Sequence, residues 1–122
     1  MKRAALMGCM VAIASSAPAQ NMPINTFLAK AGALERQGPM ALFSRDYKLL
    51  QAEIKASVLA LRAQNAAEVS SHRKPNNCMP SPVAVSPDDV LKSFRAIPAD
   101  QQTKLTTQIA INNMMAKRYP CP

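Results

Sequence analysis

The chain is poor in the residue types from which enzymatic sites are built. It has no Trp, one His and seven acidic residues among 122. The histidine, His72, lies in a polar stretch beside Arg73 and Lys74, so nothing indicates an acid–base or nucleophilic centre. Most of the acidic residues are explained by positions in the first turns of helices or on the surface. Nothing in the sequence places two of them face to face, as a hydrolase with paired carboxylates needs. We therefore predict that the protein is not an enzyme.

Metal and cofactor motifs are absent from the sequence as well. Cys78 and Cys121, which are 43 positions apart, and one His do not make the pattern of a zinc site. Asp88 and Asp89 are better explained as the acidic first turn of a helix than as metal ligands. No glycine-rich loop is present that would hold a phosphate group. We expect neither a metal nor a cofactor.

Aromatic residues, glycines and strand patterns are also scarce. The chain has two Tyr, three Phe and three Gly, and no stretch alternates between apolar and polar for more than a few residues. The core must therefore consist mainly of Leu, Ile, Val, Met and Ala. The remaining periodicity is helical, which predicts an all-α fold.

The first residues have the order of features that is typical of a secretory signal peptide. Lys2 and Arg3 precede an apolar run, and Ala17-Pro18-Ala19 places small residues where a signal peptidase reads them. We predict cleavage before Gln20, which removes residues 1–19 and leaves a single domain over 20–122. The alternative is a retained anchor or a buried first helix. The predicted location is the bacterial periplasm or the outside of the cell.

Cysteine usage agrees with an oxidising compartment. Cys9 leaves with the signal peptide, and the only remaining pair is Cys78 with Cys121. A disulfide between them would close a loop of about 44 residues, and chain entropy gives it about 4 kcal/mol of stabilisation. The alternatives are two free thiols or, on the weak motif before it, a lipidated Cys9.

Four helices are predicted in this domain, over residues 24–37, 44–70, 86–97 and 99–119. Asn25 or Thr26 would cap the first, and Gly38-Pro39 would end it. Ser44 would cap the second, and Ser86-Pro87 would begin the third. The apolar face of the second helix comprises Tyr47, Leu50, Ile54, Val58 and Leu61, and that of the fourth comprises Leu105, Ile109, Ala116 and Tyr119.

Two helix faces are candidate partner surfaces. Four basic residues of the second helix form a stripe beside its apolar face, namely Arg45, Lys48, Lys55 and Arg62. A solvated flank is the alternative explanation. In the fourth helix, Ile111 and Met114 lie off the main stripe and widen the apolar sector. Such a sector suits a partner interface or a helix buried on two sides, and Asn112 on it would need a hydrogen-bond partner if buried.

The charge of the mature chain narrows the choice of partners. Removing Lys2 and Arg3 from the 15 basic residues leaves 13 against 7 acidic residues, a net charge of +6. Outside the cytoplasm nucleic acid is not an expected partner. An acidic envelope protein or an anionic surface is more natural, with simple solubility as the plain alternative.

Three stretches resemble a group of small exported proteobacterial helical proteins without a known function. They are Phe27-Leu28-Ala29-Lys30, Gly38-Pro39-Met40-Ala41-Leu42-Phe43-Ser44 and Tyr119-Pro120-Cys121-Pro122. In addition, Cys78-Met79-Pro80 followed by the capped helix at Ser86 is similar to the closing segment of the Rap/Tai type VI secretion immunity family. That resemblance implies a small periplasmic helical protein that binds and neutralises a toxic enzyme. We therefore expect an immunity- or inhibitor-like protein-binding module, with a periplasmic stress protein or chaperone as the alternative.

Overall fold

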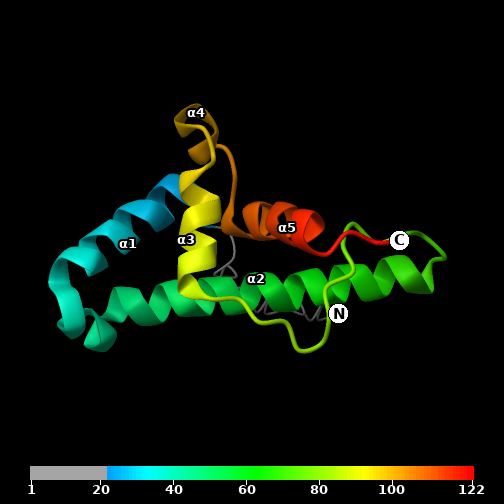
Figure 1. Cartoon of the computed structure of the whole chain (residues 1–122), viewed down its shortest axis with the longest axis horizontal. Coiled ribbons are helices and arrows are strands. Elements are labelled where there is room, and N and C mark those ends of the chain that lie inside the picture. Colours follow the sequence, from blue (N-terminus) through cyan, green and yellow to red (C-terminus); the bar gives the residue numbers. More distant parts are fainter. Residues whose placement is uncertain (1–21) are drawn as a thin grey trace, which may run out of the picture.

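A computed structural model describes residues 22–122, and within them all regular structure is helical (Figure 1). The predicted all-α fold with one Cys78–Cys121 disulfide is confirmed. The signal peptide over 1–19 and the cleavage before Gln20 lie outside the described residues. None of the helices in the described part of the chain is long and apolar enough to cross a membrane. The elements are α1 (Ile24–Gln37), η2 (Gly38–Phe43), α2 (Arg45–Ser70), α3 (Pro87–Arg95), α4 (Ala99–Gln102) and α5 (Thr107–Arg118).

Helix α2 is the long axis on which the other helices are assembled (Figure 1). Helix α5 packs along α2, and α1 returns to the start of α2 through the 3-10 helix η2. Helix α3 contacts both α1 and α5. The core between these helices is built from aliphatic, Met and Ala side chains together with one edge-to-face pair, Phe27 and Phe94, whose ring centroids are 5.0 Å apart.

Helix α1 has the predicted bounds but not the predicted cap. Its buried face comprises Ile24, Phe27, Ala31 and Leu34, which matches the helical spacing of the sequence. Neither Asn25 nor Thr26 caps it, because Pro23 occupies the N-cap position. The amide of Ile24 donates instead to the carbonyl of Leu105 at 3.0 Å, in a short β-bridge between Pro23 and Thr106. A tertiary contact therefore replaces the local cap.

The turn after α1 contains a further element that the sequence did not predict. Gly38 ends α1 with a φ of 62°, which glycine adopts without strain, and its amide donates to the carbonyl of Glu35. The next residues form η2, which ends at Phe43. The hydroxyl of Ser44 then accepts from the amide of Asp46 at 3.1 Å, so the predicted N-cap of α2 is confirmed.

Helix α2 runs unbroken to Ser70 and ends in a Schellman motif. The amide of His72 donates to the carbonyl of Val69, and the amide of Arg73 donates to the carbonyl of Glu68. His72 has φ of 57°, in the position that glycine usually fills. The predicted apolar face is present, with Leu50 and Leu61 buried, but Glu53 and Ser57 are also fully buried on it.

Helix α3 begins at the predicted cap. The Ser86 hydroxyl accepts from the amide of Asp89 at 3.1 Å, and Pro87 is the first helical residue. Val90 and Phe94 are buried on its inner face. Its end at Arg95 lies two residues before the predicted boundary.

The predicted fourth helix over 99–119 is wrong, because the chain breaks between α4 and α5. The carbonyl of Leu105 and the amide of Thr107 pair with Ile24 and Met22, so they are not available for helical hydrogen bonds. Thr106 caps α5 instead, with its hydroxyl accepting from the amide of Ile109. The break resets the phase of the helix, and Ile109 of the predicted apolar stripe is consequently 45% exposed.

Candidate functional site

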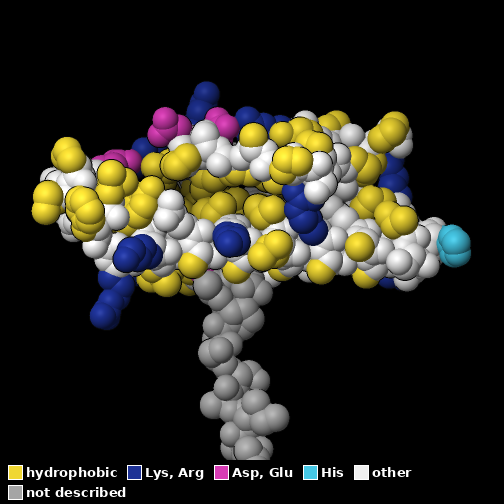
Figure 2. Space-filling view, turned by 90° about the horizontal axis from the view of Figure 1, so that it is seen from below, with side chains coloured by type: hydrophobic (Ala, Val, Ile, Leu, Met, Phe, Trp, Pro, Cys, Tyr) yellow, Lys and Arg dark blue, Asp and Glu magenta, His cyan; other side chains and the backbone are white. Residues whose placement is uncertain are grey.

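An apolar groove of about 530 Å³ lies between α1, η2, α2 and the start of α3. Figure 2 shows it as a hollow whose walls are hydrophobic side chains. This volume lies in the range of ordinary ligand sites. The apolar lining residues are Phe27, Ala31, Leu34, Ala41, Leu42, Tyr47, Leu50, Ile54, Val85, Val90 and Leu91.

Polar residues stand only at the edge of the groove. The side-chain Nε2 of Gln51 donates to the Tyr47 hydroxyl at 3.0 Å, and both groups lie on the rim. Glu35 also lines the groove, and Arg95 pairs with its carboxylate. Lys55 lines it too and takes part in none of the ion pairs formed among residues 22–122. The unneutralised charge at the edge is therefore positive.

Beside the groove, η2 exposes three large apolar side chains, which we call the apolar tip. Met40 is 68% exposed, Leu42 57% and Phe43 80%. Leu42 also lines the groove, whereas Met40 and Phe43 do not. The apolar tip and the groove are thus adjacent surfaces that share one residue.

The predicted basic stripe on α2 is divided by the structure. Arg45, Lys48 and Lys55 are exposed and lie outside the ion pairs formed within the described part of the chain. Arg62 is half-buried and donates to the carbonyl of Pro80 at 3.2 Å, so it holds the segment that follows α2. Three members of the stripe therefore remain as candidates for an anionic partner, and the fourth has a structural contact.

The second predicted partner surface is wrong. Ile111 and Met114 are buried in the core with Met115, because α5 starts at Thr107 and turns this sector toward its neighbours. The wide apolar sector belongs to a helix that is covered on two sides. The accompanying expectation for Asn112 is confirmed, since its side-chain oxygen accepts hydrogen bonds from both Asn76 and Asn77.

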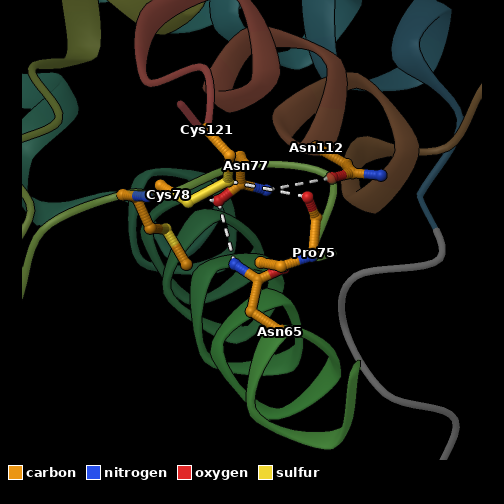
Figure 3. The surroundings of a disulfide bond; sticks show 7 residues. Asn65, Pro75, Asn77, Cys78, Asn112 and Cys121 are labelled. Atoms are coloured by element: carbon orange, nitrogen blue, oxygen red, sulfur yellow. Dashed lines mark hydrogen bonds between the residues drawn. A yellow bond between two sulfur atoms is a disulfide. The ribbon is translucent and has the colours of Figure 1, made fainter. Parts of the chain in front are cut away.

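Around the disulfide, four asparagines form what we call the asparagine clamp: Asn65, Asn76, Asn77 and Asn112. Figure 3 shows Asn65, Asn77 and Asn112 beside the disulfide. Asn77 is buried at its centre. It accepts from Asn65 of α2 at 2.9 Å and donates to Asn112 of α5 at 3.2 Å. The neighbouring amide of Cys78 donates to the carbonyl of Tyr119 at 2.8 Å, and the Cys78 and Cys121 Cα atoms are 5.0 Å apart. The linker, α2 and the C-terminal segment are thereby fixed to one another.

A buried carboxyl group lies where α2 meets the first described residues. Glu53 Oε1 accepts from the amide of Met22 at 2.9 Å, and Oε2 has no partner among residues 22–122. Burial raises the pKa of Glu53, while the Met22 amide and Thr107 act in the opposite direction. The Met22 carbonyl accepts from the amide and the hydroxyl of Thr107. Glu53 therefore helps to hold the chain entry between α2 and α5.

The candidate catalytic residue types are dispersed in the structure. His72 is exposed at the far end of α2, where Figure 2 shows the single histidine projecting into solvent. Within residues 22–122, no three His, Cys, Asp or Glu side chains gather closely enough to hold a metal ion.

Sequence reasoning missed both the groove and the apolar tip. A signal for the tip was present in Met40-Ala41-Leu42-Phe43, an apolar run between a glycine-proline helix stop and a helix cap, where no apolar helix face explains it. The groove had no sequence signal, because it depends on how far apart α1, α2 and α3 are held. No protein-family model, curated protein or solved structure matches this chain.

Proposed function

We propose that this protein is an exported, non-enzymatic binding protein whose groove receives an apolar segment of another envelope protein. The signal-peptide pattern and the Cys78–Cys121 disulfide support export. The observation that carries the proposal is the apolar groove beside three cations that lie outside the ion pairs of residues 22–122.

The lining of the groove favours a helical segment as the ligand. Grooves that bind partner helices present a continuous apolar floor to side chains spaced three and four residues apart. Here that floor is made by side chains from four elements, including Leu50 of α2 and Leu91 of α3. A segment that covers them removes apolar surface from water at about 25 cal/mol per Å².

The charges at the edge favour a segment with acidic flanks. Lys55 lies on the groove, and Arg45 and Lys48 are exposed on the same helix. The nearby carboxylates of Glu35 and Asp46 are paired with Arg95 and Lys30. An acidic partner is thereby steered to the groove, as an immunity- or inhibitor-like module would require.

Site-specific cross-linking tests the groove with a matched control. A photo-reactive residue replaces Gln51 on the groove edge or Gln64, which is exposed on the same helix away from it. We expect the Gln51 position to yield one envelope protein in stoichiometric amount, and the Gln64 position to yield none. Equal capture at both positions would overturn the proposal.

A substitution pair with equal exposure separates the groove from general surface effects. Leu42 and Leu59 are both 57% exposed, but only Leu42 lines the groove. We expect Leu42→Glu to abolish the cross-link at Gln51 and Leu59→Glu to preserve it. Loss of the cross-link in both variants would show that the groove does not select the partner.

The exposed apolar tip also supports a second candidate function, a periplasmic chaperone. A chaperone would bind many unfolded clients weakly and would suppress their aggregation in a light-scattering assay. A broad smear of cross-linked products at Gln51, together with such suppression, would favour this alternative over a single partner.

A further inference from the structure

Two side chains of the apolar tip, Met40 and Phe43, are exposed although they are not part of the groove. In a 3-10 helix, side chains three residues apart project in the same direction, so Met40 and Phe43 of η2 form one side. Both are more than two-thirds exposed and neither lines the groove. A ligand held in the groove would therefore leave these two side chains in water.

The tip lies at one end of the elongated molecule. Figure 1 places η2 at the end where α1 turns back into α2, beyond α3 and α5. In Figure 2 hydrophobic side chains gather at that end, with Lys and Arg side chains beside them. A flat surface can therefore approach the tip without first meeting the rest of the protein.

The charge around the tip is positive. Residues 30–48 contain four basic side chains, Lys30, Arg36, Arg45 and Lys48, and two acidic ones, Glu35 and Asp46. Ion pairs engage both acids, Asp46 with Lys30 at 3.2 Å and Glu35 with Arg95. Arg45 and Lys48 take part in no ion pair within residues 22–122 and follow directly on the tip.

We infer that the apolar tip inserts into the surface of an anionic lipid bilayer while Arg45 and Lys48 contact the headgroups. Apolar side chains flanked by cations are the combination that binds such interfaces. A bilayer accepts a small tip, whereas a stable protein interface needs about 1,000 Å² or more of buried surface. This inference does not rest on the proposed function of the groove.

The absence of Trp from the chain allows a direct test. Phe43→Trp places the only Trp of the protein on the tip, and Val69→Trp places it at a 58% exposed position near the other end of α2. Each full-length mature variant, with its disulfide formed, is mixed with vesicles of phosphatidylglycerol and phosphatidylethanolamine, or of phosphatidylcholine alone.

We expect a blue shift of the Phe43→Trp emission, and quenching by brominated acyl chains, with the anionic vesicles only. The Val69→Trp emission should remain unchanged. The inference is overturned by an unshifted Phe43→Trp emission, by an equal shift at Val69→Trp, or by a shift that follows protein concentration without lipid. The last outcome would show self-association through the tip.

Charge substitutions test the headgroup contact. Arg45→Gln with Lys48→Gln should weaken binding to the anionic vesicles about thirtyfold. Lys104→Gln with Lys117→Gln, which removes two exposed cations distant from the tip, should change it little. Equal weakening by both pairs would show that only net charge matters and would overturn the assigned contact. The Gln51 cross-link to a protein partner should survive Met40→Ser with Phe43→Ser, so the two proposals fail separately.

Discussion

The two halves of α2 face different kinds of surroundings. The first half, from Arg45 to Val58, contributes to an open apolar groove and follows three exposed apolar residues. The second half, from Leu59 to Ser70, has small or polar residues at most positions and lies beside the disulfide and the asparagine clamp. The first half thus lines an open apolar groove, whereas the second half is held by the hydrogen bonds of the clamp next to the disulfide.

This difference shows how a small domain with few aromatics can leave apolar surface open. Residues 62–70 include Ala63, Ala66 and Ala67 but few large apolar side chains, so hydrophobic burial contributes little there. The disulfide and the clamp stabilise this half without large side chains. Because other interactions stabilise the domain, groove residues such as Leu42 can stay exposed instead of being buried in the core.

Removing the disulfide should have the largest effect on stability. Cys78 and Cys121 are 43 positions apart, and Cys121→Ser should lower the free energy of unfolding by about 4 kcal/mol. Denaturant titration under oxidising conditions measures the change, and reducing agent should bring the wild type to the level of the variant. Coincident unfolding curves under oxidising conditions would show that the bond does not stabilise this half.

Breaking the centre of the clamp should have the next largest effect. Asn77→Ala removes a buried side chain that accepts from Asn65 and donates to Asn112, and should cost about 3 kcal/mol. Asn76→Ala is the matched control, because Asn76 is exposed and makes one of these bonds, and should cost less than about 1 kcal/mol. Similar losses in thermal unfolding would contradict a buried centre at Asn77.

Substitutions of Glu53, in the first half of α2, test how that half holds the chain entry at Met22. Glu53→Ala leaves the Met22 amide without its partner and should cost about 2 kcal/mol. Glu53→Gln keeps an acceptor for that amide and removes the charge. It should therefore be better tolerated than Glu53→Ala at neutral pH.

The pH dependence of Glu53 has a definite sign. Its pKa is raised in the folded state from a usual value of 4.5. The folded state therefore binds the proton more tightly than the unfolded state does. The resulting stabilisation is present below that value and is lost as pH rises through the raised pKa. The unfolding free energy of E53Q should thus rise relative to wild type over this range. If the difference in unfolding free energy between E53Q and wild type stays constant with pH, the pKa of Glu53 is not raised by folding.

Substitutions on the apolar tip should have the smallest effect on stability. Phe43→Ser and Met40→Ser alter side chains that are mostly in water, so each should change the free energy of unfolding by less than about 0.5 kcal/mol. Chemical denaturation measures this. A loss above about 2 kcal/mol would place these side chains in the core and remove the contrast between the two halves.

Local signals predicted the beginnings of α2 and α3 correctly. Ser44 and Ser86 cap these helices through contacts within three residues, which sequence spacing can reveal. The pairing of Cys78 with Cys121 was predicted from cysteine count alone, on the expectation that Cys9 leaves with a signal peptide. In contrast, the break before α5 depends on hydrogen bonds with Met22, which accepts from Thr107, and with Ile24, which donates to Leu105. Both partners lie more than 80 residues away along the chain. Helical periodicity carries no information on such contacts.

The candidate site was less predictable than the fold. The basic stripe indicated Arg45, Lys48 and Lys55 correctly as exposed cations, because helical spacing alone puts them on one side. The assignment of Ile111 and Met114 to a partner surface failed because it assumed an unbroken helix from residue 99. The groove required the separation of three helices, which no local pattern contains.

The bridge between Pro23 and Thr106 has a consequence for the order in which the chain folds. Met22 accepts hydrogen bonds from a residue 85 positions later, so α1 has no fixed entry until residues 105–107 have been synthesised. Contacts this distant in sequence slow folding. A nascent chain that lacks its last residues also lacks Cys121, the partner of Cys78. Synthesis alone thus delays the native state until Cys121 has been added to the chain and can pair with Cys78.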